Sequence, residues 1–396
     1  MSKVKTVVPQ LRFPEFREVE EWEVKPFKKL FSIGNGRDYK HLSAGSVPVY
    51  GSGGYMLSVD KHLHEGESVC IGRKGTINNP MFLTGKFWTV DTLFYTHSFQ
   101  QCLPKFVFAI FQSIDWLKHN EAGGVPSLSK ANIEKIETPI PRLPEQQKIA
   151  DCLSSVDELV AAQARKLDAL KTHKKGLMQQ LFPREGETQP YLRFPEFQDK
   201  REWDVRALGS LASFSSGGTP SKDNPQYWNG SIPWVSASSM YEQLIFKANH
   251  YVTPLAISNG TRIAKKGAIL ILVRGSMLFK RVPLCIAGID VAFNQDVKAL
   301  DVGPSIDCTF LLYQLSAFES RIPINETGIG AGKIDLADLK GFELFIPSQL
   351  EQQRIANCLT SLDDLIAAQT QQLEALKTHK KGLMQQLFPS AEVVEA

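Results

Sequence analysis

Two long segments of the chain have nearly the same sequence, and both have the spacing of a helix. Residues 145–181 read EQQKIADCLSSVDELVAAQARKLDALKTHKKGLMQQL, and residues 351–387 read EQQRIANCLTSLDDLIAAQTQQLEALKTHKKGLMQQL. With one residue before and two after each segment included, 29 of 40 positions are identical. A repeat this close is expected to fold the same way twice, so the rest of the chain must be arranged around two equal helices.

Apolar residues recur in alternating steps of four and three along both segments. In each copy eight of the ten positions are apolar, and Lys174 and Lys380 are among the polar exceptions. A 3.5-residue period kept over about five heptads predicts a coiled-coil seam, in which an interior glutamine can fix the register. The predicted seam, which is also the candidate partner-binding surface, comprises Ile149, Leu153, Val156, Val160, Gln163, Leu167, Leu170, Leu177 and Leu181, then Ile355, Leu359, Leu362, Ile366, Gln369, Leu373, Leu376, Leu383 and Leu387.

Each segment would form a rod about 55 Å long. Proline follows both rods, in the pairs Phe182-Pro183 and Phe388-Pro389, and proline cannot continue a helix. If the second rod packs on the first, it must run back along it, which predicts an antiparallel pair and globular parts related by a pseudo-twofold axis. Pairing of each rod with another chain is the alternative that the sequence leaves open.

A second repeat marks the start of each half. LRFPEFREVEEWEVKPFKKL at 11–30 matches LRFPEFQDKREWDVRALGSL at 192–211. The openers are offset by 181 positions and the helices by 206, so the second half has 25 additional residues in between. We predict an α+β protein with two mixed α/β domains and an internal duplication. Its segments are a domain at 1–143, a spacer helix at 144–183, a linker at 184–191, a domain at 192–349, a spacer helix at 350–389 and a tail at 390–396.

Short apolar runs broken by Gly, Pro and Asn predict the strands of both domains. These runs are 46–50, 68–72 and 86–97 in the first domain, and 231–235 and 267–276 in the second. Helical spacing predicts helices at 104–120 and 310–322, and each domain closes with a loop and a strand, at 123–141 and 328–347.

The composition excludes several classes of protein. The net charge is +3, so a basic surface for nucleic acid has to be local. The six cysteines include no CxxC pair, which favours a reduced, cytoplasmic protein over a zinc or disulfide framework. The first residues, MSKVKTVVPQLRF, lack the apolar core of a signal peptide, and no run approaches the roughly 18 apolar residues of a membrane span. We therefore expect no membrane partner.

No catalytic signature is complete. GIGAGKI at 328–334 resembles a phosphate loop, but Thr327 and Ile334 stand where that motif requires Gly and Ser or Thr. NNPMF at 78–82 lacks one proline of the Asn/Asp-Pro-Pro-aromatic loop of amino-methyltransferases, and the eight histidines include no HExxH. We expect no catalytic residue, no metal site and no cofactor in this chain.

Two basic turns are the candidate binding sites of the chain. GRKGTINN at 72–79 places cations and amides in a turn after a strand, and VRGSMLFKR at 273–281 does so at the corresponding place. Arg and Lys can contact guanine edges, Asn can pair with adenine, and the cations also neutralise phosphates. A solvated basic turn is the alternative, because charged loops are common. The candidate DNA-binding residues are Arg73, Lys74, Thr76, Asn78, Asn79, Ser127, Lys130, Arg274, Ser276, Lys280, Arg281 and Lys333.

The organisation resembles the specificity subunit of type I restriction-modification enzymes. The matching motifs are the LRFPEF…W openers at 11–22 and 192–203, the GG-TPS…YW-G-IPW run at 217–234, the EQQ-IA helix starts at 145 and 351, and the KKGLMQQLF ends at 174–182 and 380–388. The first domain departs from the pattern, with IGNGRDYKHLSAGSVPVY where the second has the fuller GG-TPS…IPW run.

The resemblance implies two target-recognition domains, each reading one half of a bipartite sequence in double-stranded DNA. It also implies an antiparallel coiled coil that separates the domains and docks two modification subunits, with restriction subunits as possible further partners. Those partners would bind S-adenosylmethionine and ATP, and this chain would be non-catalytic. A scaffold or adaptor that binds other proteins through its globular domains is the alternative function.

Overall fold

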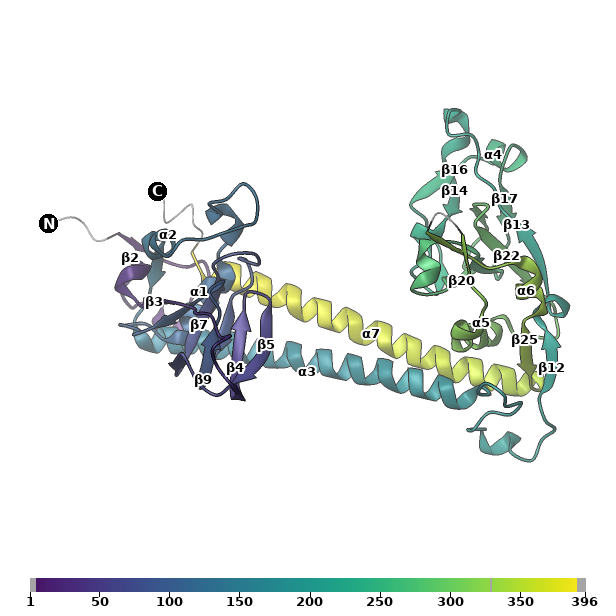
Figure 1. Cartoon of the computed structure of the whole chain (residues 1–396). Helices are drawn as coiled ribbons and strands as arrows, with labels where there is room; N and C mark the ends of the chain where they lie inside the picture. Colours follow the sequence, from purple (N-terminus) through teal and green to yellow (C-terminus); the bar gives the residue numbers. More distant parts are fainter. Residues whose placement is uncertain (1–4, 328–329, 390–396) are drawn as a thin grey trace. The chain divides into compact units, whose positions relative to one another are not determined.

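The computed structural model describes residues 5–327 and 330–389 (Figure 1). It divides into two compact units: unit 1 is Met1–Arg165 with Thr370–Ala396, and unit 2 is Lys166–Gln369. Each unit therefore holds one globular part together with a portion of both long helices. The predicted tail at 390–396 lies outside the described residues, and so does the beginning of the GIGAGKI stretch, residues 328 and 329.

The two repeated segments are continuous helices, α3 (Leu143–Leu181) and α7 (Gln349–Leu387). Each begins two residues before the predicted start, and each ends where predicted, immediately before the Phe-Pro pair. Pro144 lies in the first turn of α3. The first turn accepts proline because its backbone N–H groups have no intrahelical acceptor.

Unit 1 contains three small sheets, with strand orders β1-β2-β11, β3-β10-β7-β8 and β5-β4-β9-β6. In the third sheet β4 and β9 run parallel, and every other described strand pair of this unit is antiparallel. The strands are β1 (Thr6–Val7), β2 (Trp22–Pro26), β3 (Ser32–Asn35), β4 (Ala44–Gly51), β5 (Gly54–Val59), β6 (His64–Glu65), β7 (Ser68–Gly72), β8 (Met81–Leu83), β9 (Lys86–Thr89), β10 (Leu93–His97) and β11 (Glu137–Ile140), and the short helices are α1 (Pro104–Ser113) and α2 (Lys130–Lys135).

Unit 2 repeats this order with additions. Its sheets are β12-β25, β13-β22-β18-β20-β15, β16-β14-β21-β17 and β19-β24-β23, and β14 runs parallel to β21 as β4 does to β9. The strands are β12 (Asp204–Ala207), β13 (Ala212–Ser216), β14 (Trp228–Val235), β15 (Leu244–Ile245), β16 (His250–Val252), β17 (Arg262–Ala264), β18 (Ile269–Leu272), β19 (Arg274–Gly275), β20 (Leu284–Ala287), β21 (Val291–Phe293), β22 (Val297–Val302), β23 (Asn325–Thr327), β24 (Ala331–Lys333) and β25 (Glu343–Ile346), and the short helices are α4 (Pro254–Ser258), α5 (Cys308–Ala317) and α6 (Leu336–Gly341).

Two sequence predictions about unit 1 were wrong. The run 86–97 is not one strand: β9 and β10 belong to different sheets and are separated by a turn in which the Leu93 N–H donates to the Val90 carbonyl. The predicted helix at 104–120 ends at Ser113, because Ile114 is extended and Asp115 caps a separate 3-10 turn at Trp116–His119. The same shortening occurs in unit 2, where α5 ends at Ala317.

Each helix start is held by the opener of its own unit. In unit 1 the Trp22 indole N–H donates to the carboxylate of Glu145 over 3.1 Å, and in unit 2 Trp203 donates to Glu351 over 3.3 Å. The neighbouring Gln146 is fully buried and accepts the Leu103 N–H at the start of α1. The repeated RFPEF…W and EQQ motifs therefore meet in space and fix the direction in which each helix leaves its globular part.

The apolar core of each unit includes residues from both long helices. In unit 1, Ile149 and Leu153 of α3 share a cluster with Met384 and Leu387 of α7. In unit 2, Leu181 of α3 shares one with Ile355, Ala356 and Leu359 of α7. No helix among the described residues is long and apolar enough to cross a membrane.

Candidate nucleic-acid interface

A basic turn follows the buried strand β7 in unit 1. Arg73 and Lys74 are exposed, whereas Ile77 in the same turn is 1% exposed and anchors it to the core. The Arg73 N–H donates to the Thr92 carbonyl over 2.8 Å, and the Arg73 carbonyl accepts the Leu128 N–H over 2.9 Å. The backbone of the turn is thus fixed on both sides while its charged side chains remain in solvent.

The turn is joined to a second candidate segment. Lys74 forms an isolated antiparallel β-bridge with Ser127, and the Gly75 N–H donates to the Pro126 carbonyl over 2.9 Å. Gly75 has a φ of 89°, a conformation that favours glycine over residues with a side chain. The fold therefore brings together two predicted sites that are distant in the sequence.

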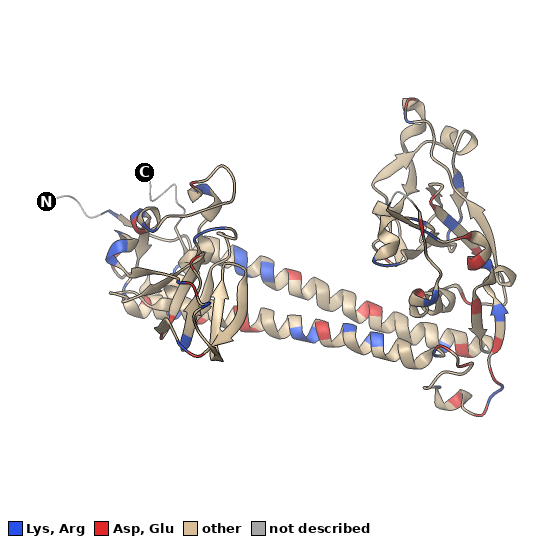
Figure 2. Ribbon diagram, in the orientation of Figure 1, with Lys and Arg blue, Asp and Glu red and all other residues tan. Residues whose placement is uncertain are grey.

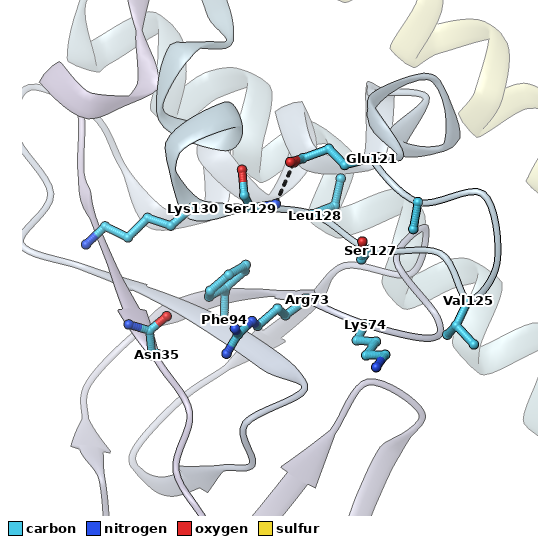
Figure 3. A pocket seen from close by; sticks show the side chains of 11 residues that line it. Asn35, Arg73, Lys74, Phe94, Glu121, Val125, Ser127, Leu128, Ser129 and Lys130 are labelled. Carbon is cyan, nitrogen blue, oxygen red and sulfur yellow. Dashed lines mark hydrogen bonds between the residues drawn. The ribbon is translucent and has the colours of Figure 1, made fainter.

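Arg73, Lys74, Ser127 and Lys130 line one open cavity of about 640 Å³ (Figure 3). Sequence reasoning missed other residues of its lining, among them Asn35 at the end of β3 and Phe94 in β10. The Arg73 guanidinium lies 5.9 Å from the centre of the Phe94 ring, close enough for a cation–π contact. Asn35 and Phe94 are partners in the β3–β10 register, which the sequence alone does not reveal.

Lys130 has a local role in this cavity. Its ammonium donates to the Ile33 carbonyl over 2.8 Å and lies 3.6 Å from Glu134. Ser129 caps α2, and the Ser129 N–H donates to Glu121 over 2.7 Å, which lowers the pKa of that carboxyl. The charge of Lys130 is therefore partly satisfied within the unit.

The other predicted residues of this turn, Thr76, Asn78 and Asn79, are exposed and do not line the cavity. They follow the Lys74–Ser127 bridge and flank the buried Ile77. Their side chains are therefore available to solvent beside the cavity rather than within it.

Unit 2 has the same backbone arrangement with different side chains. The Val273 N–H donates to the Asp296 carbonyl over 2.8 Å, and the Val273 carbonyl accepts the Ile334 N–H over 2.9 Å. Arg274 then pairs with Lys333 in the antiparallel β19–β24 register, as Lys74 pairs with Ser127 in unit 1. Arg274 and Lys333, which were predicted from separate motifs, are therefore direct neighbours.

The cations around this second turn differ in how they are held. Lys333 forms an ion pair with Asp335, and this contact lowers the pKa of the Asp335 carboxyl. Arg281 donates to the Met240 carbonyl over 2.7 Å and stacks 5.6 Å from the Tyr241 ring centre. Arg274, Ser276 and Lys280 are exposed.

The position that Asn35 and Phe94 occupy in unit 1 holds a different pair in unit 2. Ser216 and Lys298 are partners in the β13–β22 register, and the Lys298 ammonium donates to the Ser216 hydroxyl over 2.8 Å. Burial lowers the pKa of this lysine. The backbone frame is thus shared, and the side chains that it presents differ.

The predicted seam residues of α3 and α7 are buried or half-buried, and Gln163 and Gln369 are each 9% exposed. The lysines that interrupt the apolar seam form ion pairs inside their own units. In unit 2, Lys174 lies 2.5 Å from Asp363, which also accepts the Tyr313 hydroxyl over 2.7 Å. In unit 1, Lys380 lies 2.6 Å from Asp157.

The charges of the molecule are mixed. Basic and acidic residues are interspersed along the ribbons of both units, so the two basic turns are local features (Figure 2). Among residues 5–327 and 330–389, no three His, Cys, Asp or Glu side chains gather as a metal site would require. The geometry at the two turns therefore offers cations, amides and hydroxyls for binding.

The sequence of this chain matches a known protein family. Residues 19–172 and 200–378 match the model of the type I restriction modification DNA specificity domain. The specificity subunit of the type I restriction enzyme EcoR124I/EcoR124II of Escherichia coli is 30% identical over 256 residues, which cover 62% of this chain. The match spans only 60% of that relative's length. The MjaVIII specificity subunit of Methanocaldococcus jannaschii is 25% identical over 81% of this chain and 75% of its own length.

Solved structures share the fold. The crystal structure of a type I restriction-modification S subunit from M. genitalium superposes with a TM-score of 0.62 at 15% identity, covering 97% of this chain and 100% of that one. A structure from work on complex assembly and conformational transition of the type I R-M system gives a TM-score of 0.57 at 16% identity, covering 92% and 96%. At 15% and 16% identity, these superpositions show that the chain shares the mixed α+β fold of the two solved structures.

Proposed function

The chain belongs to the family of type I restriction-modification DNA specificity domains, and from this premise we propose that it is the non-catalytic specificity subunit of a type I system. Unit 1 and unit 2 would each contact one half of a bipartite target in double-stranded DNA. One observation carries this proposal: in both units an exposed basic residue bridges to the strand-like segment before a short helix, Lys74 to Ser127 and Arg274 to Lys333.

The chemistry of the two turns supports DNA as the ligand. Exposed Lys and Arg side chains bind phosphates and guanine edges, and the exposed amides of Asn78 and Asn79 can pair with adenine. The backbone hydrogen bonds that hold the turns are the same in both units, but the exposed side chains differ. This combination is expected of two DNA-binding units that dock in the same way and recognise different sequences.

We further propose that α3 and α7 form an antiparallel coiled coil that spaces the two half-sites, within an internally duplicated chain. Two ion pairs support opposite directions of the two helices. A residue late in α3, Lys174, pairs with Asp363 early in α7 within unit 2, and a residue early in α3, Asp157, pairs with Lys380 late in α7 within unit 1. A helix of 39 residues is about 58 Å long, or roughly 17 base pairs of DNA. The target would then have two short specific halves around an unread gap.

The outer faces of the helices would dock two modification subunits. Lys171, Thr172, His173 and Lys175 are exposed in α3, and the identical residues Lys377, Thr378, His379 and Lys381 are exposed in α7. Packing does not require these exposed residues to be identical in the two helices. Their identity is explained if the same surface docks one partner on each helix. S-adenosylmethionine and ATP would be bound by these modification subunits and by restriction subunits, and this chain would hold no cofactor.

The experiment is single-molecule methylome sequencing of a host that carries the system, with and without this chain. We expect adenine methylation at one bipartite motif only when the chain is present. Methylation at unrelated sequences, or a methylome that does not change, would contradict the proposal. A protein-binding scaffold would instead leave the methylome unchanged and would show no steep salt dependence in DNA binding.

A further inference from the structure

A large apolar side chain is exposed in the basic turn of unit 2. Phe279 ends the 3-10 turn Ser276–Phe279 and is 52% exposed, while the preceding Leu278 is 2% exposed. Keeping a phenyl ring in water forgoes the stabilisation that burial would provide. The core contact of the turn is already made by Leu278, so Phe279 is not needed to anchor it.

The turn that carries the ring is tightly fixed. The N–H groups of Lys280 and Arg281 both donate to the Met277 carbonyl, over 2.9 and 3.0 Å. Leu278 packs against Gly332 of β24, where an added Cβ would come within 2.9 Å of the Leu278 Cβ. A ring held on such a turn loses little conformational entropy on binding.

Cations flank the segment that carries the ring. Arg274 precedes the turn and pairs with Lys333, and Lys280 follows Phe279 directly; all three are exposed. Two residues after Phe279, Arg281 stacks on Tyr241, which is 68% exposed. Positive charge around exposed rings complements a polyanion with stacked aromatic bases better than an apolar protein groove.

Unit 1 shows that the fold does not require this ring. Its corresponding turn, between β7 and β8, also buries an apolar residue, Ile77. The residues after Ile77 are the exposed amides Asn78 and Asn79, where unit 2 has Phe279 and Lys280 after Leu278. The difference lies at the tip of the turn and therefore concerns what the turn contacts.

We propose that Phe279 acts as an apolar wedge that inserts against a base step in the half-site contacted by unit 2, unstacking it and bending the duplex there. This proposal rests on the proposed function. Proteins that insert such wedges kink DNA by tens of degrees, and pyrimidine–purine steps unstack most easily. Unit 2 would then select its half-site partly by deformability, whereas unit 1 would do so through the amides of its turn.

The test uses the full chain with its modification partners and duplexes that carry 2-aminopurine at successive positions of the methylated motif. Methyltransferases flip their target base, so 2-aminopurine at a methylated adenine brightens whether or not a wedge is present. The wild-type complex should in addition raise the fluorescence at one other step, in a single half-site. Phe279→Ala should abolish that increase and weaken specific binding by about tenfold or more, the scale of one lost base–aromatic contact. Because no charge is removed, its salt dependence should match that of the wild type.

Two variants serve as controls. Phe279→Leu keeps an apolar wedge and should retain part of the fluorescence increase, and Leu117→Ala, which removes an exposed apolar side chain of unit 1 outside the candidate interface, should leave it intact. Unchanged fluorescence and affinity in Phe279→Ala would overturn the wedge alone, and so would loss of the modification partners from this variant, since that would make Phe279 a docking residue. A wild-type complex without sequence-specific binding would overturn the proposed function as well. Circular dichroism and thermal unfolding establish that each variant is folded.

Discussion

The guanidinium of Arg12 donates two hydrogen bonds of 2.8 Å, from Nε and Nη2, to the carboxylate of Glu145, which lies 133 positions away in the sequence. The side chains are 6% and 2% exposed. In unit 2, Arg193 and Glu351 make the same two contacts at 2.7 and 2.8 Å. This pair links the opener of each unit to the first turn of its long helix, and it explains why both motifs recur together in the sequence.

Replacing Glu145 with Ala should therefore destabilise unit 1 strongly. The change leaves the guanidinium of Arg12 buried without its carboxylate, and breaking one partner of a buried pair costs about 3–5 kcal/mol. Denaturant unfolding followed by circular dichroism measures the loss. Glu158→Ala, an exposed position on the same helix, is the matched control and should change the free energy of unfolding by less than about 0.5 kcal/mol. Equal losses in the two variants would refute this role for the pair.

The long helices were predictable because their information is local. The apolar period lies within each segment and a Phe-Pro pair follows it directly, and the structure ends the helices at Leu181 and Leu387 as expected. Helical spacing misled at 104–120, where Leu117 fits the pattern yet is 54% exposed. There the apolar spacing continued by chance beyond the end of the helix, into the separate 3-10 turn that Asp115 caps.

The candidate site was predictable only in part, because its assembly depends on register. Arg274 and Lys333 could be named from their motifs, but their pairing depends on how β19 meets β24. Asn35 and Phe94 carry no motif, and they line the cavity only because β3 and β10 pair in one register. Composition likewise gave no sign that the charge of Lys130 is partly satisfied by the Ile33 carbonyl.

Lys174 and Asp363 should be energetically coupled. Their atoms approach to 2.5 Å, and the Tyr313 hydroxyl donates to the same carboxylate over 2.7 Å. The side chains are 19% and 27% exposed, so solvent screens the pair only partly. A double-mutant cycle with Lys174→Ala and Asp363→Ala should give a coupling of about 1 kcal/mol in the free energy of unfolding. Additive effects of the two substitutions would show that the ion pair contributes nothing.

The cysteines should separate into fast and slow thiols. Burial raises the pKa of Cys70 and of Cys285 to about 12, and both residues are fully buried. A raised pKa favours the thiol in the folded protein, so at pH 8 the reactive thiolate is about one part in ten thousand. Cys152 and Cys358, which are half-buried on the long helices, should be alkylated first. Iodoacetamide labelling with peptide mass spectrometry measures the order, and early labelling of Cys70 would contradict it.

Lys74 and Lys130 line the same cavity but should respond differently to substitution. Lys74 is exposed on the turn, so Lys74→Ala should reduce the slope of log affinity for DNA against log salt by about 0.9, the effect of one lost phosphate contact. The Lys130 ammonium already donates to the Ile33 carbonyl over 2.8 Å. Lys130→Ala should thus lower the free energy of unfolding by about 1 kcal/mol and change the salt slope less. Fluorescence anisotropy titrations between about 50 and 200 mM salt measure the slopes. If Lys130→Ala lowered the slope as much as Lys74→Ala, both cations would contact phosphate, and the contact with Ile33 would have to open on binding.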